Sequence, residues 1–117
     1  MIVLKEPYCG HILDGTKTLE LRCHAIKHDY YLADSTSHTV RAFLKFGNSF
    51  KLDQDTYEAT RHLHRCVSGS KPYAKTVATQ IVKVIPLDHP VPYACKRGAI
   101  GYARFHSVMN NGQGAEN

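Results

Sequence analysis

The hydrophobic pattern of the chain predicts short strands more often than long helices. The clearest case is the segment 18–22, in which polar and apolar residues alternate, the period of a half-buried strand. We expect Leu19 and Leu21 to face the core of the protein. Glu20 and Arg22 then share the opposite face of the same strand, about 7 Å apart at roughly 3.3 Å per residue.

Further strands are predicted from apolar runs and from β-branched residues. An apolar run begins directly after Met1, two more strands are separated by a polar turn at 34–38, and a β-branched segment ends at Pro86. The Pro90-Val91-Pro92 segment favours a turn before a last strand. The predicted strands are 2–4, 30–33, 40–46, 76–85 and 98–105.

Two short helices complete the set. The first is predicted over 7–14, because Pro7 suits a first helical turn and Gly15 suits the position after the last one. The second is predicted over 53–65, where Asp55 and Glu58 have capping-box spacing. Strand and helix do not alternate regularly, which argues against a doubly wound fold.

These elements predict a mainly β (α+β) fold with short helices, arranged as a small closed or nearly closed β-barrel. At 117 residues with 43% apolar content, the chain is expected to form one domain over residues 1–108. Residues 110–117 contain no large apolar side chain, so we expect residues 109–117 to be a disordered polar tail.

Charge and targeting signals narrow the function classes only slightly. Fifteen Lys and Arg against ten Asp and Glu give a net charge of +5, which suits a polyanionic partner but equally suits simple solubility. No segment has the roughly 18 consecutive apolar residues of a membrane span, and the first residues do not form a signal peptide. We therefore expect a cytoplasmic protein without membrane association.

The cysteines predict neither a disulfide framework nor a metal centre. The four cysteines are scattered and form no Cys-x-x-Cys pair, so we interpret them as reduced thiols. His62, His64 and Cys66 offer ligand atoms, but positions i, i+2 and i+4 do not converge on one helix face. We expect no metal and no cofactor.

The most informative stretch combines a turn with three charged residues. Gly15, Lys17, Glu20 and Arg22 follow the predicted helix and enter the strand at 18–22. Lys17, Glu20 and Arg22 could form an ion network on a solvated face, which contributes little to stability, or could line a ligand cleft. Under either interpretation, the sequence predicts that Lys17→Ala and Arg22→Ala change stability by under about 0.5 kcal/mol.

The pattern Gly15-x-Lys17-x-x-Glu20-x-Arg22 resembles the signature of the ASCH family, with all four motif positions filled. The segments 5–13, 73–85 and 97–105 are also similar to the usual helix and closing strands of that family, so the resemblance extends from Ile2 to about Phe105.

The resemblance implies a PUA-like β-barrel in which these motif residues meet RNA or a nucleotide-like ligand. The ASCH family is functionally mixed: some members are thought to bind RNA, a few cleave it, and one subgroup hydrolyses acetylated cytidine through a Lys and Thr pair with a carboxylate. Here Glu20 occupies the position of that threonine, and Asp88 is the only acidic residue between Cys66 and Ala115.

The leading functional hypothesis is a module that binds RNA or a nucleotide through Gly15, Lys17, Glu20 and Arg22. Lys17 and Arg22 would hold phosphates or base edges, and Glu20 would orient them or accept a base amino group. The alternative is a hydrolase acting on RNA or a modified nucleoside, with Lys17 and Glu20 as catalytic residues.

Two clusters of basic and aromatic residues could extend the binding surface, since aromatic rings stack bases and cations hold phosphates. The sequence makes no prediction about the oligomeric state. A protein-interaction role, with the barrel only as a scaffold, is a third hypothesis. The clusters are Arg61, His62, Arg65, Lys71, Tyr73 and Lys75, and Tyr93, Lys96, Arg97, Tyr102 and Arg104.

Overall fold

The computed structural model describes residues 1–93, which form a five-stranded mixed sheet with three short helices. The strand order is β1-β3-β4-β5-β2; β1 and β3 run parallel, and the other neighbouring pairs are antiparallel. The elements are β1 (Ile2–Leu4), α1 (Tyr8–Leu13), β2 (Leu19–Arg22), β3 (Tyr30–Asp34), β4 (Thr39–Leu52), α2 (Gln54–Ala59), α3 (Arg61–His64) and β5 (Thr76–Pro92).

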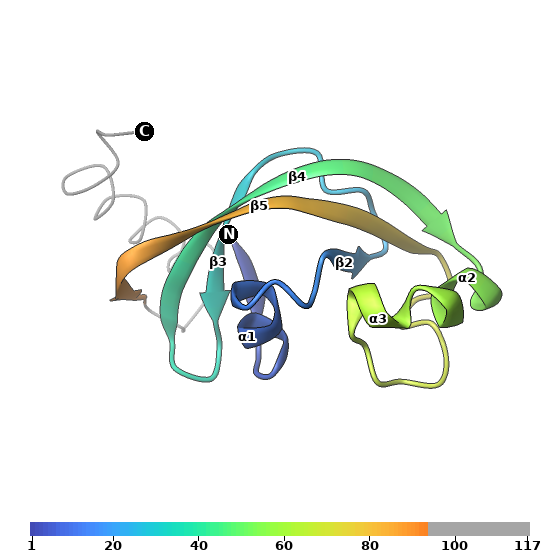
Figure 1. Ribbon diagram of the computed structural model, residues 1–117, viewed down its shortest axis with the longest axis horizontal. Coiled ribbons are helices and arrows are strands. Elements are labelled where there is room, and N and C mark those ends of the chain that lie inside the picture. Colours follow the sequence, from blue (N-terminus) through green and yellow to red (C-terminus); the bar gives the residue numbers. More distant parts are fainter. Residues whose placement is uncertain (94–117) are drawn as a thin grey trace.

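The two longest strands, β4 and β5, form a curved ribbon that arches over the helices (Figure 1). Helix α1 lies below one part of the ribbon, and α2 and α3 lie below its far end, with β2 between them. In this part of the chain β1 and β2 are the two edges of an open sheet. The mainly β fold is therefore confirmed, whereas a closed barrel is not confirmed.

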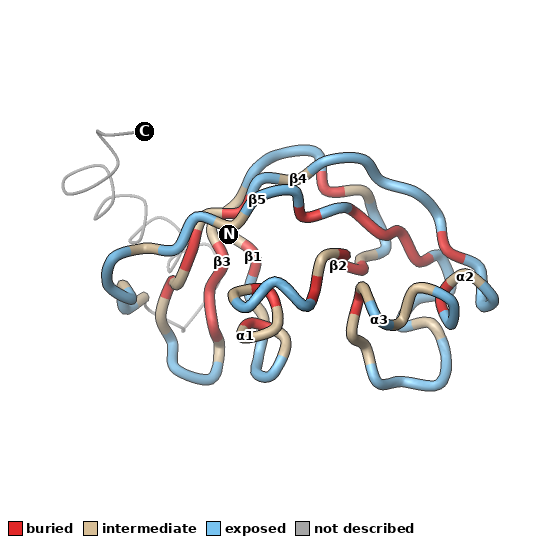
Figure 2. Tube along the Cα trace, viewed as in Figure 1, coloured by how far each residue is buried: buried red, intermediate tan, exposed pale blue. Residues whose placement is uncertain are grey.

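Within residues 1–93, three apolar clusters form the core. One packs Cys9 and Ile12 of α1 against β3 and β4. A second packs Leu19 and Leu21 of β2 against Tyr57 of α2 and the adjoining ends of β4 and β5, which confirms the predicted orientation of the two leucines. A third, small cluster lies around Ala33 and Val40. Figure 2 shows the buried residues along β1, β2 and β3, and a long exposed stretch of β4.

The two long strands exceed their predicted lengths because bulges absorb the residues that favour turns. β4 was predicted to end at Phe46, but it continues past Gly47 to Leu52, with register shifts on both sides of Phe46. A Cβ atom at Gly47 would lie 2.7 Å from Cγ1 of Val82, so the close approach of the strands requires glycine there.

β5 was predicted to end at Ile85, and Pro90-Val91-Pro92 was predicted to form a turn. Both predictions are wrong, because Val91 and Pro92 pair with β4 after a register shift. Within residues 1–93, β5 pairs with β2 only over Val77–Gln80. Prolines are tolerated beyond that range because an edge strand need not donate a hydrogen bond at every position.

The second helix was predicted as one segment over 53–65, but the structure contains two helices that meet at Thr60. The Thr60 hydroxyl donates to the Thr56 carbonyl at 2.7 Å, a bond that often bends helices. The helix cap also differs from the prediction: Asp53, and not Asp55, accepts a hydrogen bond from the main-chain nitrogen of Thr56.

The predicted last strand 98–105, the domain end at 108 and the tail 109–117 lie outside the described residues. Within residues 1–93, Cys9, Cys23 and Cys66 are free thiols. Helices α1 and α2 have six residues each, and no helix described here has the length and apolar character needed to span a membrane.

Candidate functional site

The turn between α1 and β2 brings Lys17 under the sheet. Gly15 adopts φ +85°, a left-handed conformation that glycine reaches without a Cβ penalty. The Asp14 carboxylate accepts hydrogen bonds from the main-chain nitrogen and the hydroxyl of Thr16, at 2.9 and 2.6 Å, and these bonds lower the pKa of Asp14. The main-chain nitrogen of Lys17 then donates to the His11 carbonyl at 2.9 Å.

Lys17 is buried, with only 2% of its surface exposed. Its Nζ donates to the Leu19 carbonyl at 2.8 Å and to the His64 carbonyl at 2.7 Å, and it lies 3.4 Å from Oε1 of Glu20. An ammonium group has three donors, and protein oxygens surround this one at three points. Lys17 therefore ties the turn, β2 and α3 together.

Glu20 is buried between two cations. Its Oε1 faces Lys17, and its Oε2 accepts from Nε of Arg22 at 2.8 Å. Arg22 is the outer member of the set, since 36% of its side chain is exposed. Its Nη2 is buried and has no hydrogen-bond partner within residues 1–93. The structure therefore places Lys17, Glu20 and Arg22 in one ion network whose outermost group has an unused donor.

This network lines a cavity of about 570 Å³ between the β1–α1 segment and the loop after α3. A cavity of this volume is in the range that holds small ligands. Gly15 is not among its lining residues, so its role is to shape the turn. The lining residues are Val3, Leu4, Lys5, Tyr8, Lys17, Glu20, Leu21, Arg22, Ser35, Tyr57, Cys66, Val67, Ser68, Pro72 and Tyr73.

The sequence patterns did not indicate Tyr8 or Tyr57 as residues of the cavity. Tyr8 lies next to the network, with Nζ of Lys17 5.7 Å from the centre of its ring. Tyr73, which the sequence placed in a basic cluster, also lines the cavity and is 39% exposed. Proximity of these tyrosines depends on the fold, so no local sequence spacing could have revealed it.

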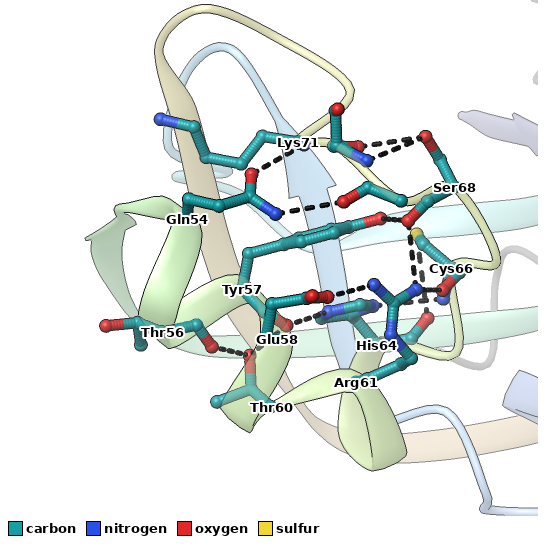
Figure 3. A network of polar contacts seen from close by, with 12 residues as sticks. Gln54, Thr56, Tyr57, Glu58, Thr60, Arg61, His64, Cys66, Ser68 and Lys71 are labelled. Atoms are coloured by element: carbon teal, nitrogen blue, oxygen red, sulfur yellow. Dashed lines mark hydrogen bonds and ion pairs between the residues drawn. The ribbon is translucent and has the colours of Figure 1, made fainter.

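His64 lies next to Lys17, because its carbonyl accepts from Nζ of Lys17. Figure 3 shows the contacts of the His64 side chain. Its Nδ1 accepts from the main-chain nitrogen of Cys66 at 3.0 Å, so the proton is on Nε2, which donates to the Tyr57 carbonyl at 2.8 Å. Its ring stacks on Tyr57 with centres 4.6 Å apart. Burial lowers the pKa of His64 and raises the pKa of the Cys66 thiol, so both groups are held neutral.

The loop after α3 is fixed by side chains of α2 and α3 (Figure 3). The Tyr57 hydroxyl donates to the Ser68 carbonyl at 2.7 Å. Nη1 of Arg61 donates to the carbonyls of Cys66 and Ser68, at 2.5 and 3.0 Å, and its other terminal nitrogen pairs with Glu58. These contacts hold one wall of the cavity in place.

The predicted basic clusters have different outcomes. In the first cluster, Arg61 makes the internal contacts described above, and Lys71 donates to two carbonyls at 3.4 and 3.5 Å. Of the second cluster, only Tyr93 lies within the described residues, where it packs against the small cluster of Ala33 and Val40. Its other members, Lys96, Arg97, Tyr102 and Arg104, lie outside that range.

A separate cluster brings ligand atoms of Glu6, Cys9 and Asp34 within 4.8 Å of one another. Their distance along the chain gives no metal-binding motif, so the sequence could not reveal it. The Glu6 carboxylate accepts from the main-chain nitrogen of Gly10 at 2.7 Å. Burial raises the pKa of the Cys9 thiol to about 11, and Asp34 and Glu6 add to the effect. These contacts stabilise the start of α1.

Comparison with known proteins identifies the fold through structure and not through sequence. No protein-family model matches the chain, and no curated protein is significantly similar to it in sequence. A crystal structure of an ASCH protein from Zymomonas mobilis is similar, with a TM-score of 0.65 and 16% identity over 78% of this chain and 71% of its own.

Two mutants of the Zymomonas mobilis protein are also similar to this chain. The serine-to-alanine mutant has a TM-score of 0.62 and 17% identity, over 78% of this chain and 71% of its own. The tyrosine-to-phenylalanine mutant has a TM-score of 0.65 and 16% identity, over 78% and 73%. At this level of identity the likeness establishes the fold alone, and the chain therefore has the fold of an ASCH domain.

Proposed function

We propose that the protein binds RNA or a nucleotide-like ligand in the cavity beside Arg22. One observation carries this proposal: the cavity of about 570 Å³ is lined by Arg22, whose Nη2 has no acceptor among residues 1–93. A buried donor without a partner is costly, and a phosphate or base carbonyl of a ligand would satisfy it. Tyr8 and Tyr73 line the same cavity and supply aromatic faces on which a base can stack.

Within this proposal the four motif residues have different roles. Arg22 contacts the ligand, and Glu20 holds the Arg22 guanidinium through the bond at 2.8 Å. Lys17 neutralises Glu20 from behind, since its donors are directed at Glu20 and at two main-chain carbonyls. Gly15 supplies the left-handed turn that delivers Lys17 to this position.

The resemblance to the ASCH family and the shared fold support RNA as the ligand class. The net charge of +5 agrees with a polyanion. A closed PUA-like β-barrel and a cytoplasmic location stay predictions from the sequence, as does binding without a cofactor.

The hydrolase alternative is less well supported by the contacts of Lys17 and Glu20. A general base must reach the substrate proton, but Nζ of Lys17 lies against two carbonyls. Both oxygens of Glu20 lie against cations of the protein, so neither oxygen is directed at a substrate. Neither residue is free to transfer a proton in this arrangement.

The experiment is a binding titration with a short fluorescent single-stranded RNA, monitored by anisotropy. Arg22→Ala should weaken binding by about tenfold or more, because a charge-assisted hydrogen bond is lost. Lys45→Ala is the matched control, since Lys45 is an exposed cation on β4 that does not line the cavity. Affinity should fall steeply with salt. Equal affinities of the two variants would contradict the proposed site.

Glu20→Gln separates a binding module from an enzyme. A binding module should retain affinity within a few fold, because glutamine can still accept from Arg22 and the carboxylate charge that repels phosphate is removed. An enzyme that uses Glu20 should lose roughly a hundredfold or more in turnover of RNA or acetylated cytidine while binding persists. We expect no robust turnover by the wild-type protein. Wild-type turnover abolished by this one change would overturn the proposal.

A further inference from the structure

A second hollow adjoins the proposed nucleotide cavity. It has a volume of about 780 Å³ and is lined by residues of α2, α3 and the following loop. Cys66 and Val67 line both hollows, so one short segment forms a ridge between them. The lining residues of this second hollow are Glu58, Arg61, His62, Arg65, Cys66 and Val67.

The ridge between the hollows is fixed from both sides. Arg61 Nη1 donates to the Cys66 carbonyl at 2.5 Å and to the Ser68 carbonyl at 3.0 Å, and the Tyr57 hydroxyl donates to Ser68 at 2.7 Å (Figure 3). The Cys66 main-chain nitrogen donates to His64 at 3.0 Å. The spacing of the two hollows is therefore set by hydrogen bonds before any ligand arrives, which lowers the ordering cost of binding.

The second hollow has more cationic than acidic side chains, and not all of the cations are paired within the described residues. Among the described residues that line it, Glu58 is the only acidic one, and its ion pair with Arg61 neutralises it. The main-chain nitrogen of Arg65 donates to the Arg61 carbonyl at 2.8 Å, and its charge helps to lower the pKa of Asp14. The guanidinium of Arg65 makes no hydrogen bond or ion pair with another residue of the described range, and neither does the side chain of the exposed His62. A partly exposed guanidinium without a partner can make bidentate contacts to a phosphate.

We propose that the second hollow is a phosphate subsite for the next nucleotide, so that the ligand is a single-stranded oligonucleotide and not a lone nucleotide. The proposal rests on the proposed function of the first cavity. A base and its sugar occupy the cavity at Arg22, the backbone crosses the ridge at Cys66 and Val67, and Arg65 contacts the following phosphate. Proteins that bind single-stranded nucleic acids generally stack bases on aromatic side chains and hold the backbone with cations.

The test compares the affinity for the four ribonucleoside 5′-monophosphates with that for a single-stranded RNA pentamer of random sequence. The test variant is Arg65→Asn, because Arg65 has φ 62° and asparagine tolerates that left-handed conformation. Lys45→Ala removes the same charge elsewhere and serves as the control. Thermal melting of each variant monitors the fold.

We expect Arg65→Asn to weaken pentamer binding about three- to tenfold and to leave mononucleotide binding within about twofold. The slope of log affinity against log salt for the pentamer should decrease by about 0.7, the value for one phosphate contact on a single strand. An unchanged pentamer affinity and slope, or equal loss for pentamer and mononucleotide, overturns the subsite while the first cavity stands. Failure of the wild-type protein to bind any of these probes at low salt overturns the proposed function and this inference together.

Discussion

Two buried carboxylates, each beside a partly exposed arginine, perform different tasks in this protein. Glu20 pairs with Arg22, and Asp34 lies 3.6 Å from Arg41. Both carboxylates are almost fully buried, and the two arginine side chains are 36% and 32% exposed. By burial and charge alone the two pairs are nearly equivalent, so the difference between them lies in their remaining contacts.

The remaining contacts of Asp34 belong to a turn. Its Oδ1 accepts from the main-chain nitrogen of Thr36 at 2.8 Å, and its Oδ2 accepts from the Ser37 hydroxyl at 3.0 Å. Glu20 instead has cations at both oxygens, and its pair lines the cavity, which Asp34 does not. A buried carboxylate satisfied by neutral donors closes a turn, whereas one held between cations positions an arginine for a further partner.

The largest expected effect is on stability, from the removal of Lys17. Lys17→Ala should lower the free energy of unfolding by about 3–5 kcal/mol, because it leaves Glu20 without its inner cation and removes a donor from two main-chain carbonyls. This replaces the sequence-based expectation of under about 0.5 kcal/mol, which assumed an exposed lysine. Urea denaturation measures the difference.

Lys45→Ala is the control for this prediction, since an exposed lysine should change stability by under about 0.5 kcal/mol. A loss of less than about 1 kcal/mol for Lys17→Ala would show that the buried network does not support the fold.

A smaller effect on stability, combined with RNA binding, distinguishes the roles of Glu20 and Asp34. Glu20→Gln and Asp34→Asn should each lower stability by about 1–3 kcal/mol, since each weakens charge-assisted hydrogen bonds. Only Glu20→Gln should alter the salt dependence of RNA binding, because only Glu20 holds a cation at the cavity. The readouts are urea denaturation and RNA binding at several salt concentrations. A change in RNA binding with Asp34→Asn would remove the functional distinction between the two pairs.

The smallest effect is the pH dependence of stability that arises from His64, whose carbonyl accepts from Lys17. Burial lowers the pKa of His64 from its ordinary value of 6.5. The unfolded chain therefore binds a proton more readily than the folded one, so stability should decline as pH falls below about 6.5. His64→Gln should reduce this decline between about pH 7.5 and about pH 5.5, as measured by urea midpoints at the two values. An identical pH dependence in the wild type and the variant would contradict a buried neutral His64.

Local sequence patterns predicted where the strands occur better than where the strands end. Leu19 and Leu21 are in the core as the alternation required. The strands predicted to end at Phe46 and before Pro86 are longer in the structure, because bulges and an unpaired edge accommodate Gly47 and Pro86 within them. Such compensation depends on neighbouring strands, which local periodicity does not contain.

The sequence grouped the charged residues of the network, but it did not predict their burial or the tyrosines beside them. The motif spacing brought Lys17, Glu20 and Arg22 together as a set, and the structure places them in one network. The Lys17 contact to the His64 carbonyl joins residues 47 positions apart. No spacing rule predicts a contact at that separation, so the sequence could not show that Lys17 is buried while Arg22 faces the cavity.

The most direct test of the site is an NMR titration that observes the side-chain Nε–H groups of Arg22 and Arg41 while a short single-stranded RNA is added. The two arginines have similar exposure and similar carboxylate partners, so each is the other's control. We predict that the Arg22 resonance shifts progressively to saturation together with those of Tyr8 and Tyr73, while the Arg41 resonance stays in place. Saturable RNA binding that shifts Arg41 and leaves Arg22 unchanged would contradict the account.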